Sequence, residues 1–338
     1  MKSNEGQILR AIAAKTFLWN SPPSPQERKF RRLASMTFLF LIGNIIFASL
    51  FALCIKWVQI RQREDIVTVG MLNYIVCAIA IAPEFLTKNS FDINAAIAGG
   101  TLGGAYFIAF FFVVFAIKRI GAAASTVISV VSIVLPILAG IYIWQESPRP
   151  LQIAGIVFAL LSLSLISGST QAREKEADRK STNIDKPSNP ENEKPWFTPL
   201  VLVTFFLLCG ISRLAQEAFK HVCDPSVHRP TFLFVAFIVA SIPSLIILFY
   251  RRRAISRGDW TMGIGLGLAN ILQTHFILKS LEYYDGFIVF PVSSAGGLMF
   301  TTLVAIVFLH ERLTRKTCCG VALAVVALCL LHWLPGSP

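Results

Sequence analysis

The sequence predicts an all-α polytopic membrane protein, with ten transmembrane helices arranged as two inverted repeats of five helices. Three observations support this prediction: an apolar composition, long apolar runs along the chain, and a second half that repeats the first. Apolar residues make up 54% and charged residues 15% of the 338 residues, and the mean hydropathy is +0.63. Because soluble domains are less apolar and more charged than this, a water-soluble fold is not expected.

The apolar runs define the predicted spans, since a helix needs about 20 apolar residues to cross the hydrocarbon core of a bilayer. The first repeat, residues 36–168, contains five such runs, at 36–58, 66–86, 94–117, 121–145 and 151–168. The second repeat, residues 197–334, contains five more, at 197–219, 231–250, 259–281, 286–309 and 317–333.

Two polar segments lie outside these repeats. Residues 169–196 combine charged residues with Ser, Asn and Pro and have too few apolar residues to form a core, so they are predicted to be a flexible linker. Residues 1–35 form a basic tail in which apolar residues recur at helical spacing between 8 and 17, as in an amphipathic helix on a membrane surface. No apolar core with a small-residue cleavage site precedes the first span, so we expect no cleavable signal peptide.

The second half repeats the first at a constant offset. An offset of 165 residues aligns Glu146 with Glu311 and Gly155 with Gly320 without a gap. In both halves a span ends, a Glu follows, and a Gly lies nine residues further on, inside the next span. We interpret Glu146 and Glu311 as structural turn residues at the membrane edges. Because five is an odd number of spans, two such halves in tandem are inserted with opposite polarity.

The two matching stretches read SVVSIVLPILAGIYIWQESPRPLQIAG and VFPVSSAGGLMFTTLVAIVFLHERLTRKTCCG. They resemble the drug/metabolite transporter superfamily, specifically its EamA-type branch with ten helices, and the resemblance covers both blocks of five spans. It implies an inverted repeat around a central cavity and transport by alternating access. The sequence departs from the pattern in two places: Pro136 aligns with Thr301, and the first span lacks the membrane-embedded Glu that the small multidrug branch carries.

Polar side chains within spans are the candidates for a solute pathway, because a central charge costs roughly 2.5 to 3.5 kcal/mol to insert. The sixth span carries Arg213, Gln216, Glu217 and Lys220 on one helix face. Arg213 and Glu217 are spaced to neutralise each other, and either residue is suited to a charged or zwitterionic solute. A static pair, or a Lys220 side chain that reaches the interface, is the alternative that the sequence leaves open.

The eighth span carries Asn270, Gln273 and Thr274 on one face near its midpoint, with His275 on a neighbouring face. Such amides suit an uncharged or zwitterionic solute, although hydrogen bonds between helices explain them almost as well. Single polar residues in the first three spans look isolated: Asn44, Asn73 and Tyr106.

Small residues form two further patterns. Ser129 in the fourth span and its repeat partner Ser294 in the ninth lie on matching small, polar stripes. These stripes either line the pathway or allow close helix packing, and Pro136 removes a backbone donor from the first of them. The four glycines between 99 and 104 form a small-xxx-small pattern twice over, which predicts close packing of the third span.

Several function classes lack their motifs. No G-x-x-x-x-G-K-[ST] loop is present for ATP, and no hydrolase motif is placed for catalysis. The net charge of +12 comes from short bursts of Lys and Arg between apolar runs, as in loops near anionic lipid, so nucleic acid is not an expected partner. No spacing among the seven cysteines resembles a zinc site or a disulfide framework, so we expect neither a metal site nor a cofactor.

We therefore predict a secondary active transporter of small organic solutes, such as metabolites, amino acids or drugs, in the plasma (inner) membrane, and not an enzyme. The alternatives are a membrane-embedded enzyme and a non-transporting receptor or scaffold. The cargo, a coupling proton or ion, the direction of transport and the oligomeric state stay open. Basic residues also leave the orientation undecided, because the short loops and the basic tail favour opposite sides as cytoplasmic.

Overall fold

The computed structural model describes residues 25–61, 64–88, 91–120, 122–163, 165, 197–309 and 315–332. Its regular secondary structure in these residues is entirely helical. The helices are α2 (Pro25–Arg61), α3 (Ile66–Lys88), α4 (Ile93–Ile120), α5 (Ala122–Val131), α6 (Val134–Tyr142), α8 (Phe197–Val222), α9 (Pro225–Arg251), α10 (Arg257–Leu281), α11 (Gly286–Leu309) and α12 (Arg315–His332). A further helix, Pro150–Leu163, lies between α6 and α8 in the chain.

The chain divides into two units, Met1–Leu39 and Phe40–Pro338, and the packing below is that of the second unit. The helix α2 begins at Pro25, earlier than the predicted first span at 36. The predicted amphipathic segment between 8 and 17 and the predicted linker at 169–196 lie outside the described residues.

Seven helices in the described residues are long and apolar enough to cross a membrane: Phe38–Val58, Ile66–Lys88, Ile93–Ala116, Pro199–Val222, Pro225–Arg251, Arg257–Leu281 and Gly286–Val304. Three shorter apolar segments, Val127–Tyr142, Pro150–Leu163 and Cys318–Ala327, overlap the predicted fourth, fifth and tenth spans. The prediction of an all-helical, multi-pass membrane protein is confirmed. Ten full-length spans were predicted, and seven reach that length in the described residues.

The predicted fourth span is broken where α5 ends and α6 begins. Pro136 has no backbone N–H, so it cannot donate to the carbonyl of Ser132, and Leu135 N donates to that carbonyl instead at 3.1 Å. The Ser132 hydroxyl donates to the Ser129 carbonyl at 2.6 Å, which supplies a local partner for a carbonyl at the end of α5. The break therefore follows from Pro136, which has no N–H to donate, and from Ser132, whose hydroxyl bonds to the carbonyl three residues before it.

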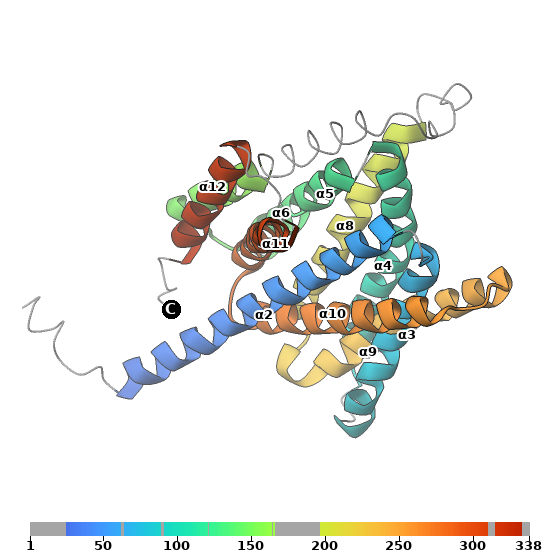
Figure 1. The fold of residues 1–338 in the computed structure, drawn as a ribbon. Helices are drawn as coiled ribbons and strands as arrows, with labels where there is room; N and C mark the ends of the chain where they lie inside the picture. The colour runs from blue at the N-terminus through green and yellow to red at the C-terminus, as the bar shows by residue number, and fades with distance from the viewer. Residues whose placement is uncertain are drawn as a thin grey trace, which may run out of the picture. The chain divides into compact units, whose positions relative to one another are not determined.

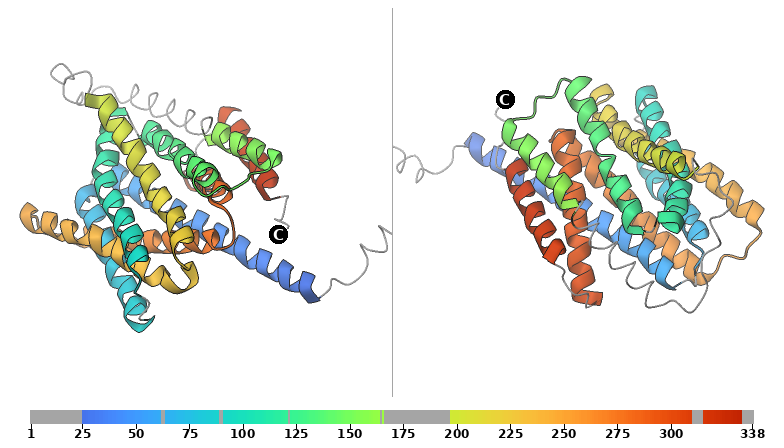
Figure 2. Two further views of the ribbon diagram at one scale, coloured as in Figure 1. Left: turned by 180° about the vertical axis from the view of Figure 1, so that it is seen from behind. Right: turned by 90° about the horizontal axis from the view of Figure 1, so that it is seen from above.

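A central bundle is formed by α3, α4, α8, α9 and α10 (Figure 1). Large side chains from these helices fill its interior, including Leu72, Leu102, Phe219, Phe232 and Phe237, each at most 1% exposed. Beside this bundle, α11, α12 and the helix Pro150–Leu163 meet through an alanine seam made of Ala159, Ala295, Ala324 and Ala327 (Figure 2).

Glycines set the closest approaches in the central bundle. A Cβ atom at Gly99 would clash with the Phe232 carbonyl oxygen, and one at Gly103 would clash with the Ala236 carbonyl oxygen. The backbones of α4 and α9 therefore touch, as the small-xxx-small pattern predicts. Gly104, by contrast, faces open space.

The same contacts give the relative directions of the helices. On α4 and α9, Gly99 meets Phe232 and Gly103 meets Ala236, so the residue numbers rise together and the two helices run parallel.

The helices α3 and α10 are also parallel, because Gly263 packs on Leu72 and Gly267 packs on Val76.

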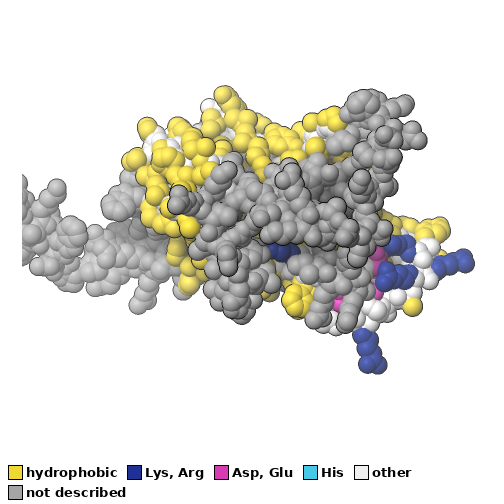
Figure 3. Space-filling model, turned by 45° about the horizontal axis from the view of Figure 1, so that its top comes forward, with side chains coloured by type: hydrophobic (Ala, Val, Ile, Leu, Met, Phe, Trp, Pro, Cys, Tyr) yellow, Lys and Arg dark blue, Asp and Glu magenta, His cyan; other side chains and the backbone are white. Residues whose placement is uncertain are grey.

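The outer surface is apolar, as a lipid environment requires. Figure 3 shows hydrophobic side chains over much of the described surface on one face, with Lys and Arg gathered at one edge. Exposed apolar residues occur on many of the helices, among them Ile79, Ile97, Ile242 and Phe249.

The first prediction concerns the contact of α4 with α9. Replacing Gly103 by Ala places a methyl group against a backbone oxygen that cannot rotate away, so we expect a loss of about 1–3 kcal/mol in stability. Gly104→Ala is the matched control, since open space accepts its methyl group and Ala is the better helix former. Thermal unfolding of the detergent-purified variants measures both effects, and equal midpoints for the two variants would contradict the packing.

Candidate functional site

An amide network, defined here as Asn44, Asn73, Asn270 and Gln273, joins three helices inside the bundle. Asn270 Nδ2 on α10 donates to Asn73 Oδ1 on α3 at 3.1 Å, and Gln273 Nε2 donates to Asn270 Oδ1 at 3.0 Å. Asn44 Nδ2 on α2 donates to the Gln273 carbonyl oxygen at 2.9 Å. The three asparagines are each at most 3% exposed, so the network replaces water inside the membrane. Asn44 and Asn73, which look isolated in the sequence, are partners of predicted site residues.

Tyr106 on α4 forms a second polar link. Gln216 Nε2 on α8 donates to the Tyr106 hydroxyl oxygen at 3.0 Å, and the Tyr74 hydroxyl donates to the Tyr106 carbonyl at 2.9 Å. The Thr274 hydroxyl lies beside the same phenol and donates to the Asn270 carbonyl at 2.8 Å. Tyr106 therefore connects the α8 candidate Gln216 with the α10 face that carries the amide network.

Arg213 on α8 holds the break between α5 and α6. Its Nη1 atom donates to the Ser129 carbonyl at 2.8 Å, to the Cys209 carbonyl at 3.3 Å and to the Ser132 hydroxyl. The predicted pairing of Arg213 with Glu217 is not found among the ion pairs of the described residues. The reason is that the broken helix offers carbonyl oxygens to the guanidinium group, which turns it away from Glu217.

Glu217 is fully buried, at 0% exposure, and neither of its carboxylate oxygens has a hydrogen-bond partner in the structure. Its carboxylate lies against Gly286, the first residue of α11, where a Cβ atom would clash with it. The positive end of the α11 dipole therefore faces this carboxylate. The nearest cationic or imidazole nitrogens are Lys220 Nζ at 3.9 Å and His221 Nε2 at 3.4 Å.

Glu146, predicted as a turn residue, lies beside Glu217 in an edge cluster that we define as Glu146, Glu217, Lys220, His221 and Asp285. Glu146 Oε1 is 3.7 Å from Lys220 Nζ and 3.6 Å from His221 Nε2, and Lys220 Nζ donates to Asp285 Oδ1 at 3.0 Å. Burial raises the pKa of Glu146 above its ordinary value, and the charge of Asp285 raises it further. The turn that brings Glu146 here includes Gln145 in a left-handed backbone conformation, with a φ of 56°.

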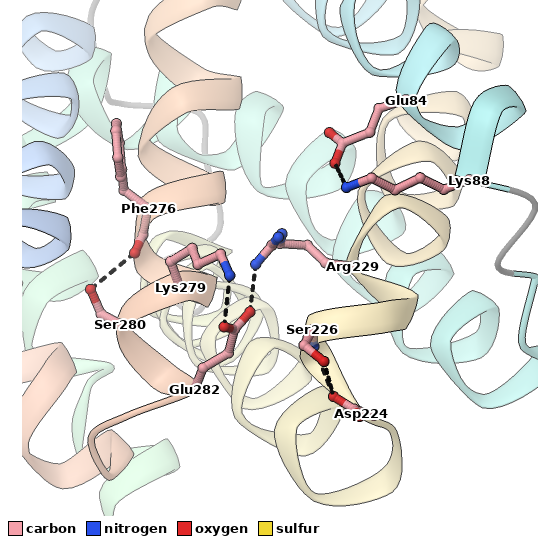
Figure 4. A network of polar contacts seen from close by, with 9 residues as sticks. All are labelled: Glu84, Lys88, Asp224, Ser226, Arg229, Phe276, Lys279, Ser280 and Glu282. Atoms are coloured by element: carbon pink, nitrogen blue, oxygen red, sulfur yellow. Dashed lines mark hydrogen bonds and ion pairs between the residues drawn. The ribbon is translucent and has the colours of Figure 1, made fainter. Parts of the chain in front are cut away.

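Two predicted site residues lie away from these groups. His275 faces the charge of Arg229, which forms an ion pair with Glu282. Figure 4 shows that Glu282 also accepts from Lys279 Nζ, at 2.9 Å. Ser294 is half-buried on α11, and no hydrogen bond between described residues links it to the amide network. His275 thus lies near an ionic cluster at the end of α10, and no hydrogen bond among the described residues links it to the amide network.

Sequence reasoning named both partners of two contacts, Gln273 with Asn270 and Arg213 with Ser129, but only one partner of the others as a site residue. Tyr106, Asn73 and Asn44 were noticed but could not be assigned to a neighbour, because periodicity along a helix shows which residues share a face and not what that face meets. Glu146 carried a usable signal, since its match to Glu311 marked it as a repeated acidic residue. The contacts of Glu311 lie outside the described residues.

The arrangement offers neutral donors and acceptors in the interior and charges toward one end. Amides and hydroxyl groups on α3, α4, α8 and α10 provide a polar surface within an apolar bundle. Arg213 adds one fixed positive charge on the α8 side. Such a set can exchange its internal hydrogen bonds for those of a polar solute, and it contains no nucleophile with an adjacent general base among the residues described above.

Comparisons with known proteins agree with these features. A protein of Haemophilus influenzae, described only as uncharacterized, is 24% identical over 221 residues, which cover 65% of this chain and 69% of that protein. A solved crystal structure superposes with a TM-score of 0.64 and 16% sequence identity, covering 88% of this chain and 97% of that one, a likeness that shows the fold alone. The EamA-like transporter family matches residues 35–168 and 193–333. Because these two segments make up most of the sequence, the chain belongs to the EamA-like transporter family.

Proposed function

We propose that this protein is a secondary active transporter of a small zwitterionic or uncharged organic solute, which passes between two inverted halves by alternating access. Membership of the EamA-like transporter family supports transport of a small solute across a membrane. The absence of a phosphate-binding loop from the sequence favours coupling to a gradient or to solute exchange over coupling to ATP.

The helix directions support the inverted arrangement. In the repeat, α3 corresponds to α9, and α4 corresponds to α10. The glycine contacts make α3 parallel to α10 and α4 parallel to α9. Thus α3 runs parallel to α10, the counterpart of α4, and α4 runs parallel to α9, the counterpart of α3. Because consecutive spans alternate in direction, this is the relation that opposite insertion of the two halves requires.

The observation that carries the proposal is that the buried polar contacts cross from one half to the other. Asn270 to Asn73 and Gln216 to Tyr106 each join a helix of the second half to a helix of the first. Solute sites of repeat-built transporters lie at such an interface, near the middle of the membrane. Relative movement of the halves would release these groups from each other, so that a solute can take their place.

The polar groups also favour a class of solute. Amide and hydroxyl groups form hydrogen bonds with a carboxylate, an amine or an uncharged polar group, and they impose no large net charge on the solute. Arg213, whose charge acts on Tyr106, is a fixed cation that suits the carboxylate of a zwitterion. An amino acid or a similarly small polar metabolite therefore fits these residues better than a lipophilic cation.

The second prediction tests transport directly. A thermal-shift screen of the purified protein against amino acids and other small metabolites selects ligands, since a ligand at 100 times its Kd stabilises by about 2.7 kcal/mol. Selected compounds are then measured as uptake into proteoliposomes. We expect saturable uptake by the wild type and at least a tenfold loss in Asn270→Ala and Gln216→Met, because each removes a contact between the halves.

Thr261→Ala is the matched control on α10, because Thr261 is exposed and bonds only to its own helix at the Arg257 carbonyl. Its uptake should equal that of the wild type. Unchanged uptake in Asn270→Ala and Gln216→Met for every solute that the wild type carries would exclude these residues from the pathway. Failure of the wild type to move any stabilising compound would contradict the transporter proposal itself.

The third prediction concerns the bond between Arg213 and the α5–α6 break. Hydrogen bonds to charged groups contribute about 1.5–3 kcal/mol each, so Arg213→Met should lower the stability of the protein by at least this amount. The Ser132→Ala variant alone should cost less, because the guanidinium group keeps its two carbonyl partners.

Unfolding of both single variants and of the double variant in detergent gives the interaction energy of this pair. Non-additivity of about 1 kcal/mol or more is expected for directly bonded residues. Strict additivity would show that Arg213 does not hold the break through Ser132.

A further inference from the structure

We propose that Glu146, Glu217 and His221 form a binding site for one divalent transition-metal ion, such as Zn²⁺, between the two halves of the protein. This site lies apart from the amide network and is not required for the proposed transport of a solute. The sequence gives only a weak signal for it: Glu217 and His221 are four residues apart on one helix face, a spacing that suits two metal ligands, but Glu146 lies 71 positions before Glu217.

The first argument is the spacing of the ligand atoms. One carboxylate oxygen from each Glu and a ring nitrogen of His221 all lie within 4.8 Å of one another. His221 Nε2 is 3.4 Å from Glu217 Oε1 and 3.6 Å from Glu146 Oε1. Ligands at about 2.0–2.2 Å from a tetrahedral zinc ion are separated by about 3.3–3.5 Å, so these atoms need little movement to share one ion.

The second argument is that no donor fully pairs with the carboxylates. None of the four buried carboxylate oxygens of Glu146 and Glu217 accepts a hydrogen bond of normal geometry, although the two carboxyl groups approach each other and Glu217 approaches the Gly286 N–H. The Glu217 side chain is 0% exposed. Buried carboxylates are normally paired with donors or bound to a metal, because an isolated charge in the interior costs several kcal/mol or more. Two of them facing the same point indicate a cation between them.

Lys220 does not fill this role. Its ammonium group donates to Asp285 Oδ1 at 3.0 Å and to the Tyr284 carbonyl at 3.4 Å, while its distances to Glu146 and Glu217 are 3.7 and 3.9 Å. With all three carboxyl groups ionised and the imidazole neutral, the edge cluster carries two net negative charges, because it holds three carboxylates and one ammonium group. One divalent cation balances this charge, whereas the α11 N-terminus supplies only about half a positive charge.

The surrounding residues hold the ligands in position. The His221 ring stacks on Trp144, with ring centroids 4.4 Å apart and an angle of 7° between the planes, which fixes the direction of Nε2. Gly286 and Gly140 make room for the carboxylates, because a Cβ atom at Gly140 would lie 2.6 Å from Glu146 Oε2 and one at Gly286 would clash with Glu217. The imidazole side chain is 24% exposed, so an ion can enter from the membrane edge.

The ligands come from both halves of the chain. Glu146 follows α6 in the first half, whereas Glu217 and His221 belong to α8 in the second. A bound ion would therefore stabilise the conformation in which these elements meet, because a ligand shifts an equilibrium toward the state that it binds better.

The fourth prediction is tested by metal binding, independently of transport. Full-length protein in detergent is stripped with a chelator and titrated with Zn²⁺ by calorimetry and with Co²⁺ by visible absorption. We expect one ion per chain and an intense Co²⁺ band, as in sites of low coordination number. Glu217→Gln, Glu146→Gln and His221→Gln should each weaken binding at least tenfold, and the triple variant should abolish it.

Gly286→Ala gives a steric test that keeps all three ligands. Its methyl group should displace the Glu217 carboxylate and weaken binding at least tenfold, whereas Gly265→Ala, which faces open space, should leave binding unchanged. The Gly286→Ala and Gly265→Ala variants therefore test the metal site even where a variant of a metal ligand fails to fold.

Two further controls separate this site from adventitious binding. The exposed thiols are removed in Cys318→Ser/Cys319→Ser, and Glu84→Gln removes a half-buried carboxylate that pairs with Lys88. Both variants should bind like the wild type. The proposal is overturned if no saturable binding occurs, if the triple variant still binds, or if the thiol variant is the one that loses it. A protein that binds Zn²⁺ here but moves no solute contradicts the proposed function alone.

Discussion

The structure depends on one constraint: a polar group among membrane helices cannot turn to water, so its own helix or a neighbouring helix must satisfy it. In the central bundle three such contacts join the two halves of the chain. Asn270 bonds to Asn73, Gln216 bonds to Tyr106, and Arg213 reaches the oxygens at the α5–α6 break. The same groups thus fix how the halves meet and provide the polar surface that a solute can use. In the proposed function, stability and transport draw on one set of hydrogen bonds.

Much of the fold could be read from the sequence, because long apolar runs leave few alternatives to helices in lipid. Where the prediction differed, local backbone chemistry was the cause. The fourth span was predicted as one helix, yet Pro136 cannot donate to the Ser132 carbonyl, so α5 and α6 are separate. The glycines of α4 were correctly assigned to packing, although only Gly99 and Gly103 meet the α9 backbone closely. Composition could not show which two of the four face the neighbouring helix.

The candidate site was harder to predict because it is assembled from contacts across the halves. Helical spacing placed Asn270 and Gln273 on one face, and they are bonded to each other. The same spacing predicted an ion pair between Arg213 and Glu217, but each of these side chains contacts groups on neighbouring elements instead. Arg213 turns to α5, and Glu217 turns to Glu146 and the start of α11. A single sequence therefore could not show which residues, far apart in the chain, are hydrogen-bond partners.

The glycine contacts also determine what can move as a unit. Where α4 touches the α9 backbone, no side chain separates the two helices, and where α10 lies against α3, Gly263 and Gly267 pack directly on the Leu72 and Val76 side chains. Such seams resist sliding, because interlocked surfaces of this kind have discrete fits and no continuum of positions. The movement of the halves proposed above therefore has to separate α3 from α10 and α4 from α9 in discrete steps, because both seams join one repeat to the other.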